Sequence, residues 1–134
     1  MTTEKMKKKI LVVEDHKDSC MWISAVLRQT GFTAIEAGDG TMAVRLARSE
    51  QPDLILLDLH LPCGNGQFVL ESLKKQESCR HIPVIIMSGE ADLDENALHE
   101  MGAVEVFHKP VEVNTFLRAI KEWVGKAVPE LESA

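Results

Sequence analysis

The stretch Asp53-Leu54-Ile55-Leu56-Leu57-Asp58 decides the fold of this 134-residue chain. Its four consecutive apolar residues are typical of a short strand that is buried on both faces. Asp58 ends the run, and a loop that contains His60, Pro62 and Gly66 follows it. In open α/β sheets ligands bind outside the carboxyl ends of the strands, which is where this pattern places Asp58. We therefore expect Asp58 to belong to a functional site.

Comparable runs elsewhere in the chain also end in polar side chains. The run ILVV at 10–13 is followed by Glu14 and Asp15, and the run VIIM at 84–87 is followed by Ser88. A shorter strand pattern ends at Lys109, directly before Pro110. Carboxylates, a hydroxyl and an ammonium group at neighbouring strand ends would suit a hard cation and a phosphoryl group.

Strand patterns alternate with helical patterns along the whole chain, which favours a parallel sheet covered on both faces. The expected strands are residues 9–14, 33–37, 53–58, 83–88 and 104–108. The second and fifth alternate and carry a charge, so they read as edge strands. We predict an α/β fold with a doubly wound, five-stranded parallel sheet in the order 2-1-3-4-5. It would form a flavodoxin-like three-layer sandwich with five helices, the second of them capped by Asp39.

Length and composition define a single domain. We expect it to span residues 9–126, between a flexible N-terminal tail (1–8) and a C-terminal tail (127–134), with no separate output domain in the chain. The formal net charge of −6 argues against direct binding of nucleic acid. Three cysteines without a CxxC spacing, and no apolar run long enough for a signal peptide or membrane span, predict a cytoplasmic protein that does not contact membranes.

The expected site would concentrate negative charge. Three clustered carboxylates repel one another unless a cation lies among them, and oxygen ligands favour Mg²⁺. His16 and His60 lie near the site in sequence and leave a transition metal open as the lesser alternative. His16 by itself is more typical of a solvated start of the first helix. A carboxylate in such a site can act as a nucleophile and form an aspartyl phosphate, with Lys109 and Ser88 holding the phosphoryl oxygens. Pro110 raises the chance of a cis peptide that aims Lys109 into the crevice.

At this point the chain resembles a known family. The motifs that carry the resemblance are Val13-Glu14-Asp15, Asp53 to Asp58, Pro62, Gly66, Ser88, Gly102-Ala103 and Lys109-Pro110. Together they resemble the receiver domain of two-component response regulators over about residues 8–125. Each motif is weak alone, but their order and their places at strand ends are specific.

The resemblance implies a role for each site residue. Asp58 would accept a phosphoryl group from a sensor histidine kinase or a histidine phosphotransfer protein. Asp15, Asp58 and the backbone carbonyl of His60 would bind Mg²⁺, and Glu14 would act through water. Lys109 would pair with the phosphoryl group, and Ser88 would move toward it. The protein would be a switch that promotes only its own phosphorylation and dephosphorylation, and it would signal to a downstream protein through the last two helices and the fifth strand.

One position departs from the family, and two others correspond to positions that vary within it. Val106 occupies the place, three residues before the lysine, where the family commonly has an aromatic residue that turns inward on activation. Phe107 is adjacent but should point to the other face of the strand. His60 and Glu90, each two positions after a site residue, correspond to variable positions that tune hydrolysis of the phosphoryl group.

Three other functions remain open on the sequence. A receiver-like domain that no longer takes phosphate could still bind partners, although the intact site weighs against it. A phosphatase with an aspartate nucleophile commonly has a second aspartate two residues later, where this chain has His60. A flavodoxin-like protein needs a hydroxyl- and glycine-rich loop after the first strand, where Glu14 and Asp15 would repel a flavin phosphate.

Overall fold

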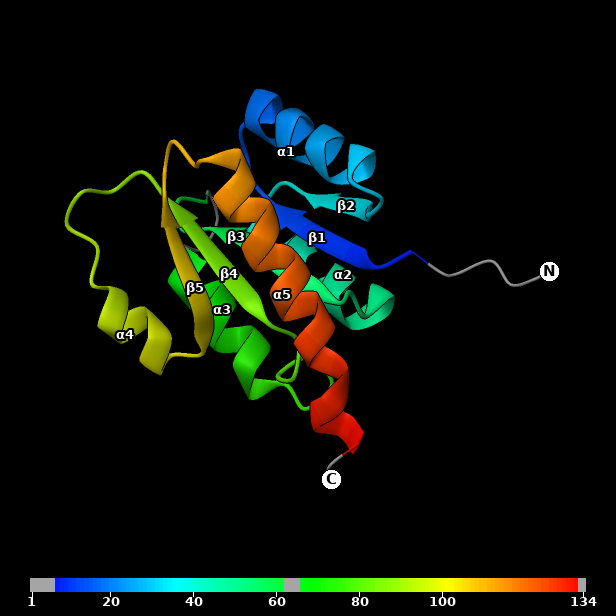
Figure 1. Cartoon of the computed structure of the whole chain (residues 1–134). Helices are drawn as coiled ribbons and strands as arrows, with labels where there is room; N and C mark the ends of the chain where they lie inside the picture. The colour runs from blue at the N-terminus through cyan, green and yellow to red at the C-terminus, as the bar shows by residue number, and fades with distance from the viewer. Residues whose placement is uncertain (1–6, 62–65, 133–134) are drawn as a thin grey trace.

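The computed structural model describes residues 7–61 and 66–132, with 126–132 described by their backbone alone. Within these residues five strands alternate with five helices, as the sequence patterns predict (Figure 1). The elements are β1 (Lys9–Val13), α1 (Lys17–Gln29), β2 (Thr33–Ala37), α2 (Gly40–Glu50), β3 (Leu54–Asp58), α3 (Gly66–Lys75), β4 (Val84–Ser88), α4 (Glu95–Glu100), β5 (Ala103–His108) and α5 (Val113–Glu132). Residues 1–6 of the expected N-terminal tail, and Pro62, lie outside the described residues.

The strands form one parallel sheet in the order β2-β1-β3-β4-β5, which confirms the predicted topology. All residues of β3 and β4 are buried, as their continuous apolar runs predict for strands covered on both faces. The edge strands β2 and β5 are mostly half-buried or exposed, in line with their alternating sequences. The three central strands therefore fix the middle of the sheet, and the site lies at their carboxyl ends.

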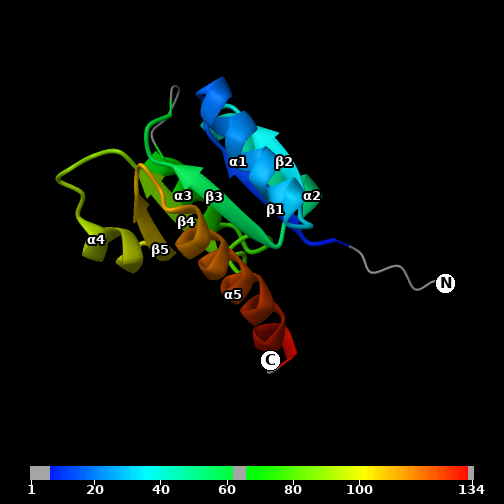
Figure 2. The same ribbon diagram turned by 45° about the horizontal axis from the view of Figure 1, so that its top comes forward.

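Helices cover both faces of the sheet and divide the core into two clusters. On one face α1 and α5 contribute buried residues such as Ile23, Leu27 and Ile120. On the other face α2, α3 and α4 contribute residues such as Ala47 and Leu70. Figure 2 shows α1 and α5 on the same side of the sheet. Burying one large aliphatic side chain stabilises a fold by about 1.5–3 kcal/mol, so these two clusters hold the three layers together.

Helix ends agree with the sequence at one place and differ at another. The side chain of Asp39 accepts a hydrogen bond of 2.8 Å from the backbone N–H of Met42, so Asp39 caps α2 as predicted. A C-terminal tail was expected to begin at residue 127, but α5 continues to Glu132 and includes Pro129. Proline removes one backbone donor, and the residues Glu130 to Glu132 that follow it favour helix. Within the described residues, no helix is both long and apolar enough to cross a membrane.

Gly66 begins α3 and packs directly against the end of β3. Its backbone N–H donates a hydrogen bond of 2.9 Å to the carbonyl of Leu59. A Cβ atom at this position would lie 2.5 Å from the Cα of Leu59 and 2.7 Å from the carbonyl oxygen of Asp58. Because both neighbours are backbone atoms, they cannot move without displacing Asp58. Glycine thus lets the first residue of α3 lie directly against the backbone at the end of β3.

We expect Gly66→Ala to lower the free energy of unfolding by about 1–3 kcal/mol, since the added methyl group must push apart two backbone segments. Urea unfolding measures the change. Gly125→Ala is the matched control, because a Cβ atom there meets nothing within 4 Å. That substitution in a helix should be neutral or stabilise the protein by up to about 1 kcal/mol. Equal effects of the two substitutions would contradict the packing role of Gly66.

Candidate functional site

The carboxyl ends of β1, β3 and β4 bring together side chains that are far apart in the sequence. Val13 of β1 is in register with Leu57 of β3, so the next residues, Glu14 and Asp58, meet at one edge of the sheet. Asp58 is in turn in register with Met87 of β4, directly before Ser88. The winding of the sheet reverses between β1 and β3, and such switch points are where open α/β sheets form ligand sites.

Lys109, which follows β5, links two buried acids of this site. Its Nζ atom lies 2.9 Å from Glu14 Oε1 and 2.8 Å from Asp58 Oδ2. Both carboxylates are almost completely buried, whereas the Lys109 side chain keeps 29% of its exposure. Burial acts to lower the pKa of Lys109, but its hydrogen bonds to Asp58 and Glu14 outweigh burial and raise that pKa above its ordinary value. Lys109 is therefore a firmly charged counter-ion. The peptide bond between Lys109 and Pro110 is cis, as the sequence suggested.

Backbone donors fix the other polar groups at the strand ends. The N–H of His60 donates a hydrogen bond of 2.9 Å to Asp58 Oδ1, so both oxygens of Asp58 have a donor. Ser88 is fully buried, and its Oγ accepts a hydrogen bond of 3.0 Å from the N–H of Glu90. The carbonyl of Ser88 accepts a bond from the N–H of Lys109. Ser88 is thus held beside the site and tied to the backbone of the residue that carries the ammonium group.

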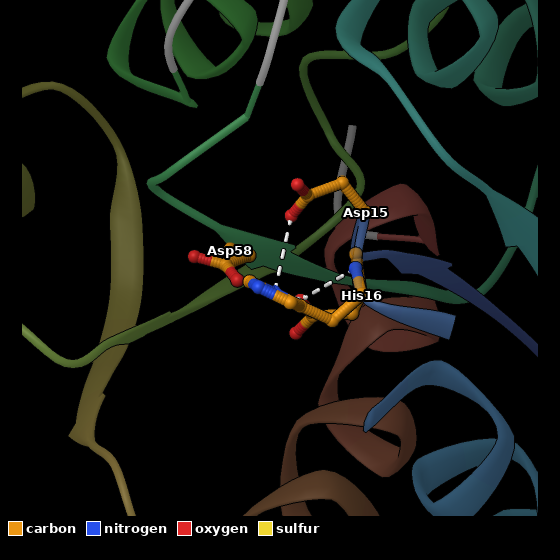
Figure 3. Close-up of side chains that lie close together, drawn as sticks. Asp15, His16 and Asp58 are labelled. Carbon is orange, nitrogen blue, oxygen red and sulfur yellow. Dashed lines mark hydrogen bonds and ion pairs between the residues drawn. The ribbon is translucent and has the colours of Figure 1, made fainter. Parts of the chain in front are cut away.

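Atoms that could bind a metal ion gather on the exposed side of the buried carboxylates. Ligand atoms of Glu14, Asp15, His16 and Asp58 all lie within 4.8 Å of one another. The side chains of Asp15, His16 and Asp58 point toward one another in Figure 3. Three carboxylates here face one ammonium group, so the cluster keeps an excess of negative charge. Closely spaced carboxylate oxygens with excess charge are what a hard divalent cation requires.

His60 and Glu90, the two variable positions, contact each other beside the cluster of carboxylates. The imidazole of His60 contacts the carboxylate of Glu90, with 3.3 Å between Nε2 and Oε2. This contact joins the loop after β3 to the loop after β4. Both side chains remain about half-exposed. His60 and Glu90 therefore lie at the rim of the site, and only the backbone N–H of His60 reaches Asp58.

Val106 and Phe107 point to opposite faces of β5, as the strand pattern predicts. Val106 packs against the cluster formed with α2, α3 and α4. Phe107 packs on the other face against Phe116 of α5, edge to face, with 5.7 Å between ring centroids. Phe107 therefore contacts α5. It does not replace the aromatic residue that the family commonly has at the position of Val106, on the opposite face of β5.

His16 is a site residue that the sequence offered only as a lesser candidate for a metal ligand, with a solvated helix start as the preferred interpretation. It is largely exposed, as expected for the start of a helix, but its Nδ1 atom lies 3.3 Å from Glu14 Oε2 and 3.5 Å from Asp15 Oδ1. The only signal in the sequence was its position directly after the two acids. The turn after β1 brings the imidazole ring of His16 next to the two carboxylates. The spacing of apolar residues in the sequence does not predict such a turn.

Comparison with known proteins identifies the class that this fold and site define. Residues 10–121 match the family model of the response regulator receiver domain, so the chain belongs to the receiver-domain family of response regulators. It is 35% identical to the polar-differentiation response regulator DivK of Brucella ovis over 123 residues, which are 91% of this chain and 100% of that protein.

Solved structures of receiver domains have the same fold. A CheY-like receiver domain protein from Methanospirillum hungatei JF-1 aligns with a TM-score of 0.85 at 27% identity, over 93% of this chain and 99% of that one. The receiver domain of the sensor histidine kinase PA1611 from Pseudomonas aeruginosa PAO1 aligns with a TM-score of 0.82 at 29% identity, over 90% of this chain and 99% of that one. That second structure has a magnesium ion coordinated in its active site cleft.

Proposed function

We propose that this chain is a phosphorylation-dependent switch of two-component signalling, in which Asp58 accepts the phosphoryl group. One observation carries the proposal: the buried Asp58 carboxylate is held by the Lys109 ammonium group, 2.8 Å away, inside a cluster of further acids. A buried carboxylate that serves only the fold would need a counter-ion but no additional carboxylates. Membership of the receiver family supports the same conclusion.

The transfer itself needs positioning and charge compensation from the protein. An oxygen of Asp58 forms a bond to phosphorus while the bond from phosphorus to the donor breaks, and the electron pair of that bond leaves with the donor. The donor is the phosphohistidine of a sensor histidine kinase or a histidine phosphotransfer protein, or a small acyl phosphate. Lys109 lies where it can hold the incoming phosphoryl oxygens, and the buried hydroxyl of Ser88 can approach them from β4.

The donor set at the site fits Mg²⁺. Glu14, Asp15 and Asp58 offer closely spaced carboxylate oxygens, and the one ammonium group among them leaves negative charge uncompensated. Asp15, Asp58 and the backbone carbonyl of His60 would hold the ion directly, and Glu14 would act through water. The ion would offset the charge of the phosphoryl oxygens as they approach a carboxylate.

The phosphoryl group can act as a signal only if two conformations of the protein contact it differently. Ser88 and Lys109 lie at the ends of β4 and β5, so these strands and the helices α4 and α5 would carry the change to a downstream protein. With Val106 in place of an aromatic residue, movement of Ser88 would be the main local response. The protein would act in the cytoplasm as a switch without turnover of a separate substrate.

Intact mass after incubation with acetyl phosphate tests the proposal. We expect the wild type to gain the mass of one phosphoryl group in the presence of Mg²⁺, and to gain little without it. Asp58→Asn should gain none. Asp53→Asn is the matched control, because Asp53 directly precedes the same strand and contacts Lys9 at the opposite end of the sheet. It should be phosphorylated like the wild type.

Three results would count against the proposal. Equal labelling of wild type and Asp58→Asn would exclude Asp58 as the acceptor. Steady hydrolysis of a phosphomonoester by the wild type would instead support a phosphatase with an aspartate nucleophile. If the wild type took up no phosphoryl group in Mg²⁺ although it was folded, the chain would be a partner-binding module that works without phosphate.

A further inference from the structure

His16 occupies the N-cap position of α1 but does not cap the helix. Its backbone is extended, with φ −81° and ψ 118°, and no side-chain capping hydrogen bond is formed among the described residues. Ser, Thr, Asp and Asn are the usual residues at such a position, because their short side chains reach the free N–H groups of the first turn. The imidazole instead turns back to the acids that follow β1 (Figure 3).

The spacing of the atoms around His16 matches that of neighbouring ligands on one metal ion. With metal–ligand distances of about 2.1 Å, adjacent ligands of an octahedral ion lie about 3 Å apart. His16 Nδ1 lies 3.5 Å from Oδ1 of Asp15, a residue proposed above to hold the ion directly, and 3.3 Å from Oε2 of Glu14, a residue proposed to act through water. Lys109 uses the other oxygen of Glu14, Oε1, so the ammonium group and the imidazole do not compete for one atom.

On the basis of the function proposed above, we propose that His16 is a nitrogen ligand of the cation site, which therefore accepts first-row transition cations in addition to Mg²⁺. Imidazole nitrogen is a good ligand for Ni²⁺, Cu²⁺ and Zn²⁺ and a poor one for Mg²⁺, which prefers oxygen. A mixed set of carboxylate oxygens and one imidazole would shift the preference of the site toward such ions. His60 does not share this role, because its ring faces Glu90 at the rim.

Calorimetric titration with Ni²⁺ alone and with Mg²⁺ alone tests the inference. We expect the wild type to bind Ni²⁺ more tightly than Mg²⁺. His16→Ala should weaken Ni²⁺ binding at least about tenfold, the lower limit of the losses in metal affinity found when residues that support metal ligands are replaced. The same substitution should change the affinity for Mg²⁺ by no more than about twofold. His81→Ala is the matched control, because His81 is an exposed histidine that precedes β4. In a parallel NMR titration of the wild type, paramagnetic Ni²⁺ should broaden the ring signals of His16 first.

Three results would overturn the inference. Ni²⁺ binding that is unchanged by His16→Ala would show that the imidazole is not a ligand. An equal loss of Ni²⁺ and Mg²⁺ binding would show that His16 only shapes the acidic pocket. Equal weakening by His81→Ala would mean that surface histidines bind the ion. In each case phosphorylation of Asp58 in Mg²⁺ remains a separate measurement, so failure of the inference is distinct from failure of the proposed function.

Discussion

Replacement of Lys109 by methionine is expected to lower the free energy of unfolding by about 2–3 kcal/mol at neutral pH. Removing one partner of a buried ion pair leaves an uncompensated buried charge, which costs about 3–5 kcal/mol, and the partial exposure of Lys109 reduces that cost. Glu14 and Asp58 would both lose their ammonium partner. Urea unfolding of the two proteins measures the difference. Lys121→Met, an exposed lysine of α5, is the control and should change stability by no more than about 0.5 kcal/mol.

The same substitution should show a characteristic pH dependence. The pKa of Lys109 is raised in the folded protein, so its contribution to stability is complete below the pKa of the unfolded chain and is lost as the pH rises through the folded pKa. The difference in stability between wild type and Lys109→Met should therefore be constant around neutral pH and shrink in strongly alkaline solution. A variant as stable as the wild type at neutral pH would contradict the counter-ion role of Lys109.

Saturating Mg²⁺ is expected to raise the free energy of unfolding of the wild type by about 2.7 kcal/mol at a hundred times its dissociation constant. The gain follows because only the folded protein brings Glu14, Asp15 and Asp58 together. Asp15→Asn should lose most of this gain, since it removes the charge of one carboxylate of the proposed Mg²⁺ site. Without metal the same variant should be at least as stable as the wild type, because one of the repelling carboxylates is neutral.

Thermal or urea unfolding with and without Mg²⁺ checks this pair of expectations. Asp92→Asn, at an exposed aspartate between β4 and α4, is the control and should gain as much from Mg²⁺ as the wild type. If Asp15→Asn were stabilised by Mg²⁺ to the same extent as the wild type, the ion would bind elsewhere on this acidic protein. We thus expect Asp15→Asn to be less stable than the wild type in Mg²⁺ and at least as stable without it. That result would show that the clustered carboxylates destabilise the protein when no cation is bound.

The fold could be predicted from the sequence because its central strands carry an unambiguous pattern. Continuous apolar runs such as 54–57 and 84–87 can be buried only between two helix layers, and the alternating strands 33–37 and 104–108 then fall at the edges. Parallel strands put all their carboxyl ends at one edge of the sheet. The approach of Glu14 to Asp58 and Lys109 was therefore predictable from strand order alone.

Other features depend on contacts that no local pattern encodes. The pairing of His60 with Glu90 requires two loops to meet, and the position of the His16 ring depends on the turn between β1 and α1. The C-terminal tail was predicted to begin at residue 127, whereas α5 continues through Pro129 to Glu132. The close approach of Gly66 to Asp58 likewise depends on how α3 packs against the end of β3.

Chemical trapping of the phosphorylated residue tests the central claim most directly. Borohydride reduces an aspartyl phosphate to homoserine, which changes the mass of a single residue in a peptide map. After incubation with acetyl phosphate and Mg²⁺, we predict homoserine at position 58 and at no other position, with a strongly reduced yield when Mg²⁺ is omitted. Homoserine at another aspartate, or an unchanged Asp58 in protein that has gained a phosphoryl group, would contradict the account.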